Sequence, residues 1–400
     1  MRGVELRWLA SLALVGLALG GCGKSLSGTK LGVETTGRDG ASGLATANTT
    51  RLGGASAVLD AAAVARTVYP GLTDGTRPRA VVLVDERDWP AALAASVLAG
   101  APLRAPILYT EGDSLPSASA QALAAMRPTG VPRLGYSQVI TISSAASPGA
   151  YRRRAVPAGE AARAAGAIER LAVRASGVQP RDVIIASSDA PAALEMPAAG
   201  LSAQTGAPIL LVNARTVPAA TRVVLRRLRQ PRIYIVGPTG AVSQRVAEEL
   251  GRYGRVARIN GGDASSNAIA VARFSDGSFG WGVEEPGHGL VFATASRPLD
   301  APAAAALSAS GDYAPLLLLE GEGRIPGELA AYLRGIQPGY TSEPQYRPVH
   351  GVYNHGWVIG DEQAISPATQ AELDSLLEIT KRPSPPGNPP ATSEPQEFEQ

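Results

Sequence analysis

The chain has 400 residues, of which 18% are charged, and its formal net charge is +2. Its single cysteine excludes an internal disulfide and a cysteine-ligated metal site in a monomer. Between two terminal segments, residues 1–47 and 381–400, about 330 residues remain, enough for two or three domains.

Residues 1–21 have the composition of a secretory signal peptide, with Arg2 and Arg7 before an apolar stretch at 8–19. About a dozen apolar residues are too few for a membrane-spanning helix, which needs about 20. The order Leu-Gly-Gly-Cys at 19–22 resembles a bacterial lipobox, which implies cleavage before Cys22 and lipidation of its sulfur. Acyl chains on Cys22 would hold the protein on the outer face of the cytoplasmic membrane, facing the cell wall. The alternative is an ordinary signal peptide with an incidental cysteine.

The segments next to the folded region are both predicted to be flexible. Residues 22–47 are rich in Gly, Ser and Thr and have no apolar period, which is typical of a tether. Residues 381–400 are rich in proline and polar groups, which predicts a disordered tail.

One pattern then occurs three times, at 48–153, 154–257 and 258–380. Each copy contains the motif Asp-x-Pro-Ala-Ala, which begins at residues 88, 189 and 300. Each copy also has a later apolar run that opens on Ala-Pro, as in APILLV at 207–212. Arg51, Arg154 and Arg258 stand near the start of the copies, 103 and 104 residues apart. Signals that recur in order at one period indicate a tandem repeat.

Each copy is expected to run in the order helix, strand, helix, strand, helix, strand, helix. Its apolar runs are short and bounded by turn residues, as is typical of parallel strands buried on both faces. The helical segments are rich in alanine, which lets them pack close to a sheet. The fold class predicted is therefore α/β, with three small doubly wound parallel-sheet units of Rossmann or flavodoxin type. The expected strands lie at 80–85, 105–110 and 138–143, at 183–188, 207–212 and 232–237, and at 290–299, 314–319 and 356–360.

The aspartate of the repeated motif is expected to have a structural role. Aspartate is among the best helix N-caps because its carboxylate accepts hydrogen bonds from N–H groups that lack a partner, and proline is tolerated in a first turn. Asp88, Asp189 and Asp300 are therefore predicted helix caps. The alternative is an anion site at each helix N-terminus, but a carboxylate already there would repel phosphate. Catalysis would require a partner acid, base or nucleophile, and none recurs beside the motif.

Charge is distributed unevenly along the chain. Residues 152–258 have 17 Arg and 7 acidic residues, a net charge of +10, whereas residues 259–380 have 5 Arg and 15 acidic residues, a net charge of −10. Guanidinium groups suit the phosphates or carboxylates of a polymer. The alternatives are solvated helix faces, or attraction between basic and acidic units within one molecule. The candidate ligand-binding arginines are Arg152, Arg153, Arg154, Arg222, Arg226, Arg227, Arg229 and Arg232.

Two segments of the third copy, 276–289 and 337–354, are rich in aromatic residues in a chain that has few. Aromatic rings in loops stack on sugar faces, so Tyr340, Tyr346 and Tyr353 are candidate ligand contacts. The alternative is that these rings cover an edge of the core.

No motif points to catalysis or to a cofactor. The histidines at 288, 350 and 355 do not have the spacing of a common zinc site, so we expect no metal. Neither a Gly-x-Ser-x-Gly elbow, a phosphate-binding loop nor a dinucleotide-binding fingerprint is present.

The ordered set of a starting arginine, an Ala-rich helix, Asp-x-Pro-Ala-Ala and Ala-Pro-Ile-Leu-Leu resembles the cell wall-binding repeat type 2 family, known from triplicated surface modules of clostridial S-layer proteins. The resemblance covers residues 50–380 and is strongest in 154–257. It implies that three α/β units pack with pseudo-threefold symmetry and bind anionic polymers of the wall. The family's signature, Ala-Pro-Ile-Leu-Leu, falls in our predicted buried strands, which would support the binding face without touching the ligand.

We therefore expect a non-enzymatic, lipid-anchored surface protein that binds a cell-wall glycopolymer through three repeats. No nucleic-acid partner or cofactor is expected, and an oligomer is not required. The alternatives are a solute-binding lipoprotein of a transporter, which predicts two lobes and a hinge, and a wall-modifying enzyme.

Overall fold

The structure is a computed structural model that describes residues 33–36, 42–143, 145–146, 148–157, 159–309, 314–340 and 353–381. All of these belong to one compact unit, Gly32–Gln400. The predicted signal peptide, Cys22, Tyr346 and the segment 382–400 lie outside the described residues.

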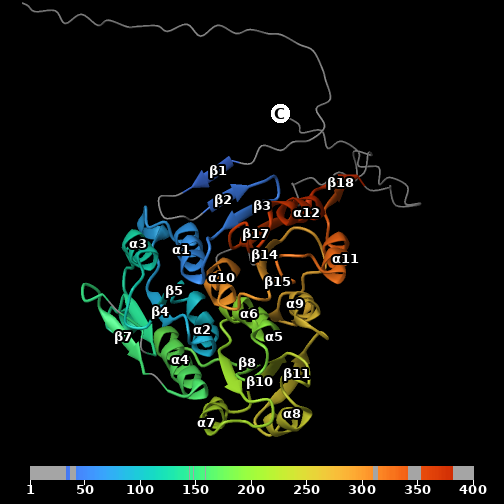
Figure 1. The fold of residues 1–400 in the computed structure, drawn as a ribbon. Coiled ribbons are helices and arrows are strands. Elements are labelled where there is room, and N and C mark those ends of the chain that lie inside the picture. The colour runs from blue at the N-terminus through green and yellow to red at the C-terminus, as the bar shows by residue number, and fades with distance from the viewer. Residues whose placement is uncertain are drawn as a thin grey trace, which may run out of the picture. The chain divides into compact units, whose positions relative to one another are not determined.

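Three sheets with the same strand order form the framework (Figure 1). In each, the first strand of the unit lies between the unit's second and third strands, and a fourth strand pairs with the third. All nine of these pairings are parallel. Sheet 1 consists of β4 (Val81–Asp85), β5 (Ile107–Thr110), β6 (Val139–Ile142) and β7 (Arg153–Val156). Sheet 2 consists of β8 (Asp182–Ser187), β9 (Ile209–Val212), β10 (Arg232–Val236) and β11 (Arg255–Ile259). Sheet 3 contains β14 (Gly289–Thr294), β15 (Leu316–Leu319), β17 (His355–Ile359) and β3 (Thr49–Leu52).

The predicted fold class is confirmed by this arrangement. Every residue of β5, β9 and β15, which carry the Ala-Pro runs, is buried. Fully apolar strands of this kind require cover on both faces of the sheet, and alanine-rich helices supply it.

Sheet 3 takes its fourth strand from the other end of the chain. β3 pairs in parallel with β17, with Arg51 opposite Val358, so residues from before the first unit complete the third. The corresponding strands β7 and β11 complete sheets 1 and 2, and the boundaries predicted at 153/154 and 257/258 fall inside these two strands. Each fourth strand leads directly into the first helix of the next unit along the chain, α4 or α9, and β3 leads into α1.

Two strands fall within the predicted tether at 22–47. β1 (Val33–Thr36) and β2 (Ser42–Ala45) form an antiparallel pair, and β2 pairs with β3 at the edge of sheet 3. The backbone groups of β3 that face away from β17 provide hydrogen-bonding partners for this hairpin, which composition alone does not reveal.

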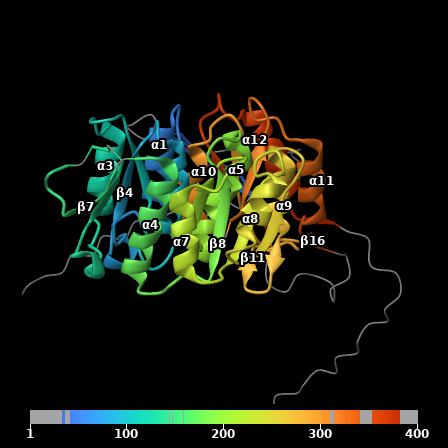
Figure 2. The same cartoon turned by 90° about the horizontal axis from the view of Figure 1, so that it is seen from below.

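Helices connect the strands of each unit. Figure 2 shows two of them, α4 and α7, side by side over sheet 2. The helices of the first unit are α1 (Ala57–Val68), α2 (Trp89–Ala95) and α3 (Ser117–Met126). Those of the second are α4 (Ala161–Ser176), α5 (Ala192–Glu195), α6 (Pro197–Thr205), α7 (Ala219–Leu228) and α8 (Gln244–Leu250). Those of the third are α9 (Ala264–Arg273), α10 (Asp300–Ser308), α11 (Gly327–Gly335) and α12 (Pro367–Leu377). The short elements are η1 (Asp74–Thr76), η2 (Ser96–Ala99), η3 (Pro132–Leu134), β12 (Ser275–Asp276), β13 (Phe279–Gly280), β16 (Gly339–Tyr340) and β18 (Thr380–Lys381).

The segments that follow the first strand of each sheet meet at a common centre. η2, α6 and α10 contact one another, and Ala99, Ala203 and Ala305 form a small buried cluster there. Small side chains let the three segments approach closely. A Cβ on Gly100 would lie 2.1 Å from the carbonyl oxygen of Ala203, so glycine is required at this contact. The Asp-x-Pro-Ala-Ala segments thus begin the helices that join the three units.

Candidate functional site

The first of the three motif aspartates acts as a helix cap. Asp88 is the N-cap of α2, and its Oδ1 accepts a hydrogen bond from the N–H of Ala91 at 3.2 Å. Its Oδ2 accepts a second hydrogen bond, from the Ser143 hydroxyl at 2.5 Å. The carboxylate is therefore occupied by structural contacts.

Asp189 and Asp300 do not cap helices, contrary to the sequence prediction. α5 begins only after Pro191, and Asp189 instead accepts a hydrogen bond from the N–H of Ala214 at 2.8 Å. α10 begins one residue earlier than predicted, so Leu299 is the N-cap and Asp300 is the first helical residue. The motif is the same in both copies, but the helix begins at a different position relative to it.

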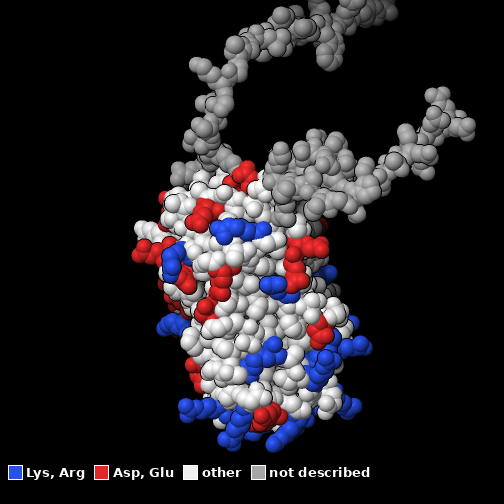
Figure 3. Space-filling model, turned by 90° about the vertical axis from the view of Figure 1, so that its right-hand side faces the viewer, with Lys and Arg blue, Asp and Glu red and all other residues white. Residues whose placement is uncertain are grey.

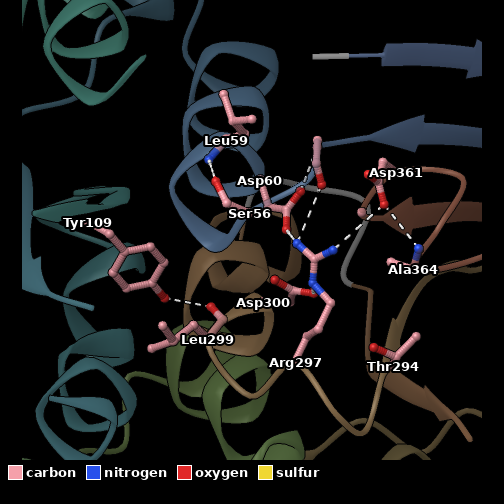
Figure 4. Close-up of polar contacts among 12 residues, drawn as sticks. Ser56, Leu59, Asp60, Tyr109, Thr294, Arg297, Leu299, Asp300, Asp361 and Ala364 are labelled. Carbon is pink, nitrogen blue, oxygen red and sulfur yellow. Dashed lines mark hydrogen bonds and ion pairs between the residues drawn. The ribbon is translucent and has the colours of Figure 1, made fainter. Parts of the chain in front are cut away.

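Asp300 belongs to a cluster of charges centred on Arg297, in the loop between β14 and α10 (Figure 4). The Arg297 guanidinium forms an ion pair with Asp60 of α1 through Nη2. Its Nε lies 3.2 Å from Oδ2 of Asp300, and its Nη1 lies 3.9 Å from Oδ1 of Asp361, just after β17. We call these four residues the junction cluster, because Asp60 comes from the first unit and the other three from the third.

Burial governs the electrostatics of the junction cluster. Asp60 and Asp300 are both 0% exposed. Burial, opposed by the charge of Arg297, raises the pKa of Asp60 to about 6. Burial and the neighbouring Asp60 raise the pKa of Asp300 well above its ordinary value. One guanidinium faces three carboxylates in this site, so burial and the repulsion between the carboxylates outweigh its effect on the pKa of both buried groups.

A pocket of about 420 Å³ opens beside the junction cluster. The N-termini of α1, α2 and α10 converge on it, and it lies at the carboxyl ends of β4 and β14. This is the edge at which open α/β sheets usually bind ligands. We call it the junction pocket, and it is lined by Ala55, Ser56, Ala57, Glu86, Trp89, Arg297, Pro298, Leu299 and Asp300.

Sequence reasoning missed the residues that form this pocket. Arg297 stands three residues before Asp300, a spacing that could have signalled an ion pair across a first helical turn. Asp60 and Arg297 are separated by 237 positions, and only the packing of α1 against α10 brings them together.

The arginines that mark the repeat starts have different environments. Arg51 is fully buried and donates to the carbonyl oxygens of Gly360, Asp361 and Ile365 at 2.7–3.0 Å. It also donates to Oε1 of Gln370 at 3.0 Å.

The counterparts of Arg51 are less buried. Arg258 donates to the carbonyl oxygens of Gly237 and Val242 at 2.9 and 2.8 Å. Arg154 is exposed on β7. Two of the three arginines therefore hold the loop after the third strand of a sheet, and the other faces solvent.

Four of the predicted ligand-binding arginines have exposed side chains. Arg152, Arg153 and Arg154 are consecutive residues on or next to β7, the edge strand of sheet 1. Arg229 is exposed just after α7. Among the residues that the structure describes, none of these four side chains forms an ion pair.

The other four are engaged by side chains of the same unit, so these contacts do not join the basic unit to the acidic one. Each contacts an acidic or aromatic side chain on a neighbouring element. The pairs are Arg222 with Glu249 at 3.5 Å, Arg227 with buried Glu169, Arg232 with Asp182 at 2.5 Å, and Arg226 over the ring of Tyr253 at 5.9 Å.

Charges of the two signs gather in different regions of the surface. In the view of Figure 3, Lys and Arg gather at the lower end, where Figure 1 places α7 and α8, and most Asp and Glu lie above. This agrees with the net charges of the second and third units counted from the sequence.

Two of the three candidate tyrosines lie among the described residues. Tyr353 is 60% exposed, Tyr340 ends the short strand β16, and Tyr346 lies outside the described residues. In the other aromatic segment, Phe279 is 1% exposed and stacks on Tyr234 of β10 at 3.8 Å. That ring covers the core edge between the second and third units.

The described residues contain no group of three or more His, Cys, Asp and Glu side chains placed to hold a metal ion. Within the same residues, no helix has the length and apolar character needed to cross a membrane.

Comparison with known proteins gives a family match and two structural similarities. Cwp8 from Clostridium difficile superposes with a TM-score of 0.62 and 19% sequence identity, covering 83% of this chain and 52% of that one. Cwp6 from Clostridium difficile superposes with a TM-score of 0.64 and 16% identity, covering 84% of this chain and 49% of that one. The chain thus spans about half the length of these proteins, and at these identities the likeness establishes a shared fold.

No curated protein matches the sequence. The family match is to cell wall binding domain 2, over residues 161–247, which contain β8, β9 and β10 of sheet 2. This is the unit in which the resemblance was strongest from sequence. Residues 161–247 therefore match cell wall binding domain 2, which confirms for the second unit the family resemblance predicted from the repeats.

Proposed function

We propose that the protein is a non-enzymatic, lipid-anchored surface protein that binds an anionic polymer of the cell wall. The observation that carries this proposal is the match of the second unit to cell wall binding domain 2. The same fold is repeated in the first and third units, which supports binding through three repeats.

The exposed arginines support an anionic ligand. Arg152, Arg153 and Arg154 follow one another along an edge strand, where their guanidinium groups are free to contact a chain of phosphates or carboxylates. Four other candidate arginines are held by intramolecular contacts, so we place the polymer on β7 and on Arg229 after α7.

Co-sedimentation with purified cell walls tests the polymer claim. We expect the protein to sediment with intact walls and to remain in solution with walls stripped of anionic polymers. Changing Arg152, Arg153 and Arg154 together to Gln should weaken sedimentation about tenfold or more, since charge-assisted hydrogen bonds are each worth about 1.5–3 kcal/mol.

A matched control removes the same charge elsewhere. Arg77, Arg273 and Arg324 pair with Asp74, Glu284 and Glu320 on the surface, and their joint change to Gln should leave wall binding unchanged. Equal sedimentation with intact and stripped walls would reject the anionic polymer, and equal loss in both triple variants would reject the assigned surface.

The anchor rests on Cys22, the sole cysteine, which follows the predicted signal peptide. Metabolic labelling with a fatty acid should mark the wild-type protein and not Cys22→Ser. Label on the Cys22→Ser variant, or none on the wild type, would contradict a lipid anchor at this position.

A further inference from the structure

The junction pocket differs in chemistry from the exposed arginines of β7. Trp89 is half-buried, packs partly against the main core and also lines the pocket. Ala57, Pro298 and Leu299 add apolar surface beside it. A volume of about 420 Å³ is at the lower end of the range for small-molecule pockets, so it suits a single ring more than a long chain.

The polar groups of the pocket are held in fixed positions. Arg297 cannot turn freely, because its guanidinium is bound by the carboxylates of the junction cluster. Ser56 caps α1 and accepts from the N–H of Leu59 at 3.4 Å (Figure 4). Glu86, directly after β4, is half-buried, and its backbone N–H donates to Thr110 at 3.0 Å. The side chains of Arg297 and Ser56 and the backbone of Glu86 are therefore preorganised around the pocket.

The balance of charge disfavours an acidic ligand. Arg297 is the one basic side chain in the lining, and Asp60, Asp300 and Asp361 already offset its charge. A phosphate or carboxylate would therefore gain little from Arg297 and would be repelled by Glu86. A neutral ring with hydroxyl groups meets no such penalty, since it can donate to Glu86, exchange hydrogen bonds with Ser56 and place an apolar face on the indole.

The junction of the second and third units has an amide where the junction cluster has a carboxylate. Asn267 of α9 corresponds to Asp60 of α1, since each accepts a hydrogen bond from a glycine N–H after the fourth strand, from Gly261 and Gly54 respectively. Asn267 donates to the carbonyl oxygen of Leu194 at 2.6 Å, so an amide contact replaces the ion pair at the second junction.

From these contacts we propose that the junction pocket binds one sugar residue with free hydroxyl groups and no acidic group, stacked against Trp89. The inference deepens the proposed wall binding and depends on it only for the source of the sugar. An anionic polymer would then be held at two places, by charge on β7 and by one of its neutral sugars in the junction pocket.

The test uses the full chain and two free monosaccharides of similar size, N-acetylglucosamine and glucuronic acid. Saturation-transfer NMR and tryptophan fluorescence should report binding of N-acetylglucosamine and much weaker binding of glucuronic acid. Trp89→Leu should weaken binding of the neutral sugar about tenfold. Trp357→Leu, the matched change on β17 outside the pocket, should leave it unchanged.

Glu86→Gln tests the charge argument without altering the shape of the pocket. Its affinity for glucuronic acid should rise toward that for the neutral sugar. Unchanged binding in Trp89→Leu, tighter binding of glucuronic acid than of N-acetylglucosamine by the wild type, or no binding of the neutral sugar would each overturn the inference. Wall co-sedimentation of the same variants separates the two proposals, because retained wall binding without sugar binding rejects the pocket alone.

Discussion

Replacing the buried Arg51 of β3 should lower the free energy of unfolding far more than replacing its counterparts Arg154 and Arg258. In Arg51→Met the carbonyl oxygens of Gly360, Asp361 and Ile365 lose their donors within a buried site. At about 1–2 kcal/mol for each of the three carbonyl groups left without a donor, we expect the free energy of unfolding to fall by about 3–6 kcal/mol. This is a large fraction of the 5–15 kcal/mol or so that stabilises a typical protein.

The repeat supplies a graded series for this experiment. Arg258→Met deprives two carbonyl oxygens of their donor and should cost about 2–4 kcal/mol. Arg154→Met changes an exposed side chain and should stay within about 0.5 kcal/mol of the wild type. Urea unfolding followed by circular dichroism measures all three. Equal losses for Arg51→Met and Arg154→Met would refute the reasoning, because burial and hydrogen bonding would then not decide the cost.

Three further predictions concern pH, packing and salt. Burial raises the pKa of Glu195 to about 8 from 4.5, so the folded protein keeps a proton that the unfolded chain releases. The free energy of unfolding should fall as pH rises from about 4.5 to about 8, by at most about 1.4 kcal/mol per pH unit from this group. Thermal denaturation of Glu195→Gln across this pH range should show a shallower fall. An unchanged slope would contradict the raised pKa of Glu195. Gly100→Ala places a Cβ 2.1 Å from the Ala203 carbonyl and should lower the free energy of unfolding by about 1–3 kcal/mol, whereas Gly149→Ala, with nothing within 4 Å, should be nearly neutral in the same urea assay. Wall binding through the arginines of β7 should weaken as ionic strength rises, and sedimentation insensitive to added salt would argue against a charged contact.

The repeated strands could be predicted from sequence because their signal is local. Apolar runs such as ILLV at Ile209–Val212 are buried throughout, and their spacing at one period identified the three sheets. The membership of β3 in sheet 3 could not be predicted, since nothing in the sequence near Arg51 indicates that its strand pairs with β17 at His355–Ile359.

The candidate site was predicted less well than the fold, for a related reason. The arginines were chosen by their density along the chain, but whether Arg227 faces solvent or buried Glu169 depends on how α7 packs against α4. Likewise, the motif at Asp300 predicted a cap, and the outcome was decided by an arginine and by a helix from another unit. Spacing in sequence identifies elements, whereas the partners of a charged side chain depend on contacts between them.

The pairing of β3 with β17 also constrains the order in which the protein is completed. Arg51 and Gln370, which join these regions, are 319 residues apart, so β3 lacks its parallel partner β17 until nearly the whole chain has been made. Contacts of such long sequence separation form slowly, and an unpaired strand edge in the meantime is prone to aggregation. Sheets 1 and 2 take their strands from continuous stretches of chain and can form while synthesis continues. We therefore expect the last step of folding to be the pairing of β3 with β17, which completes sheet 3.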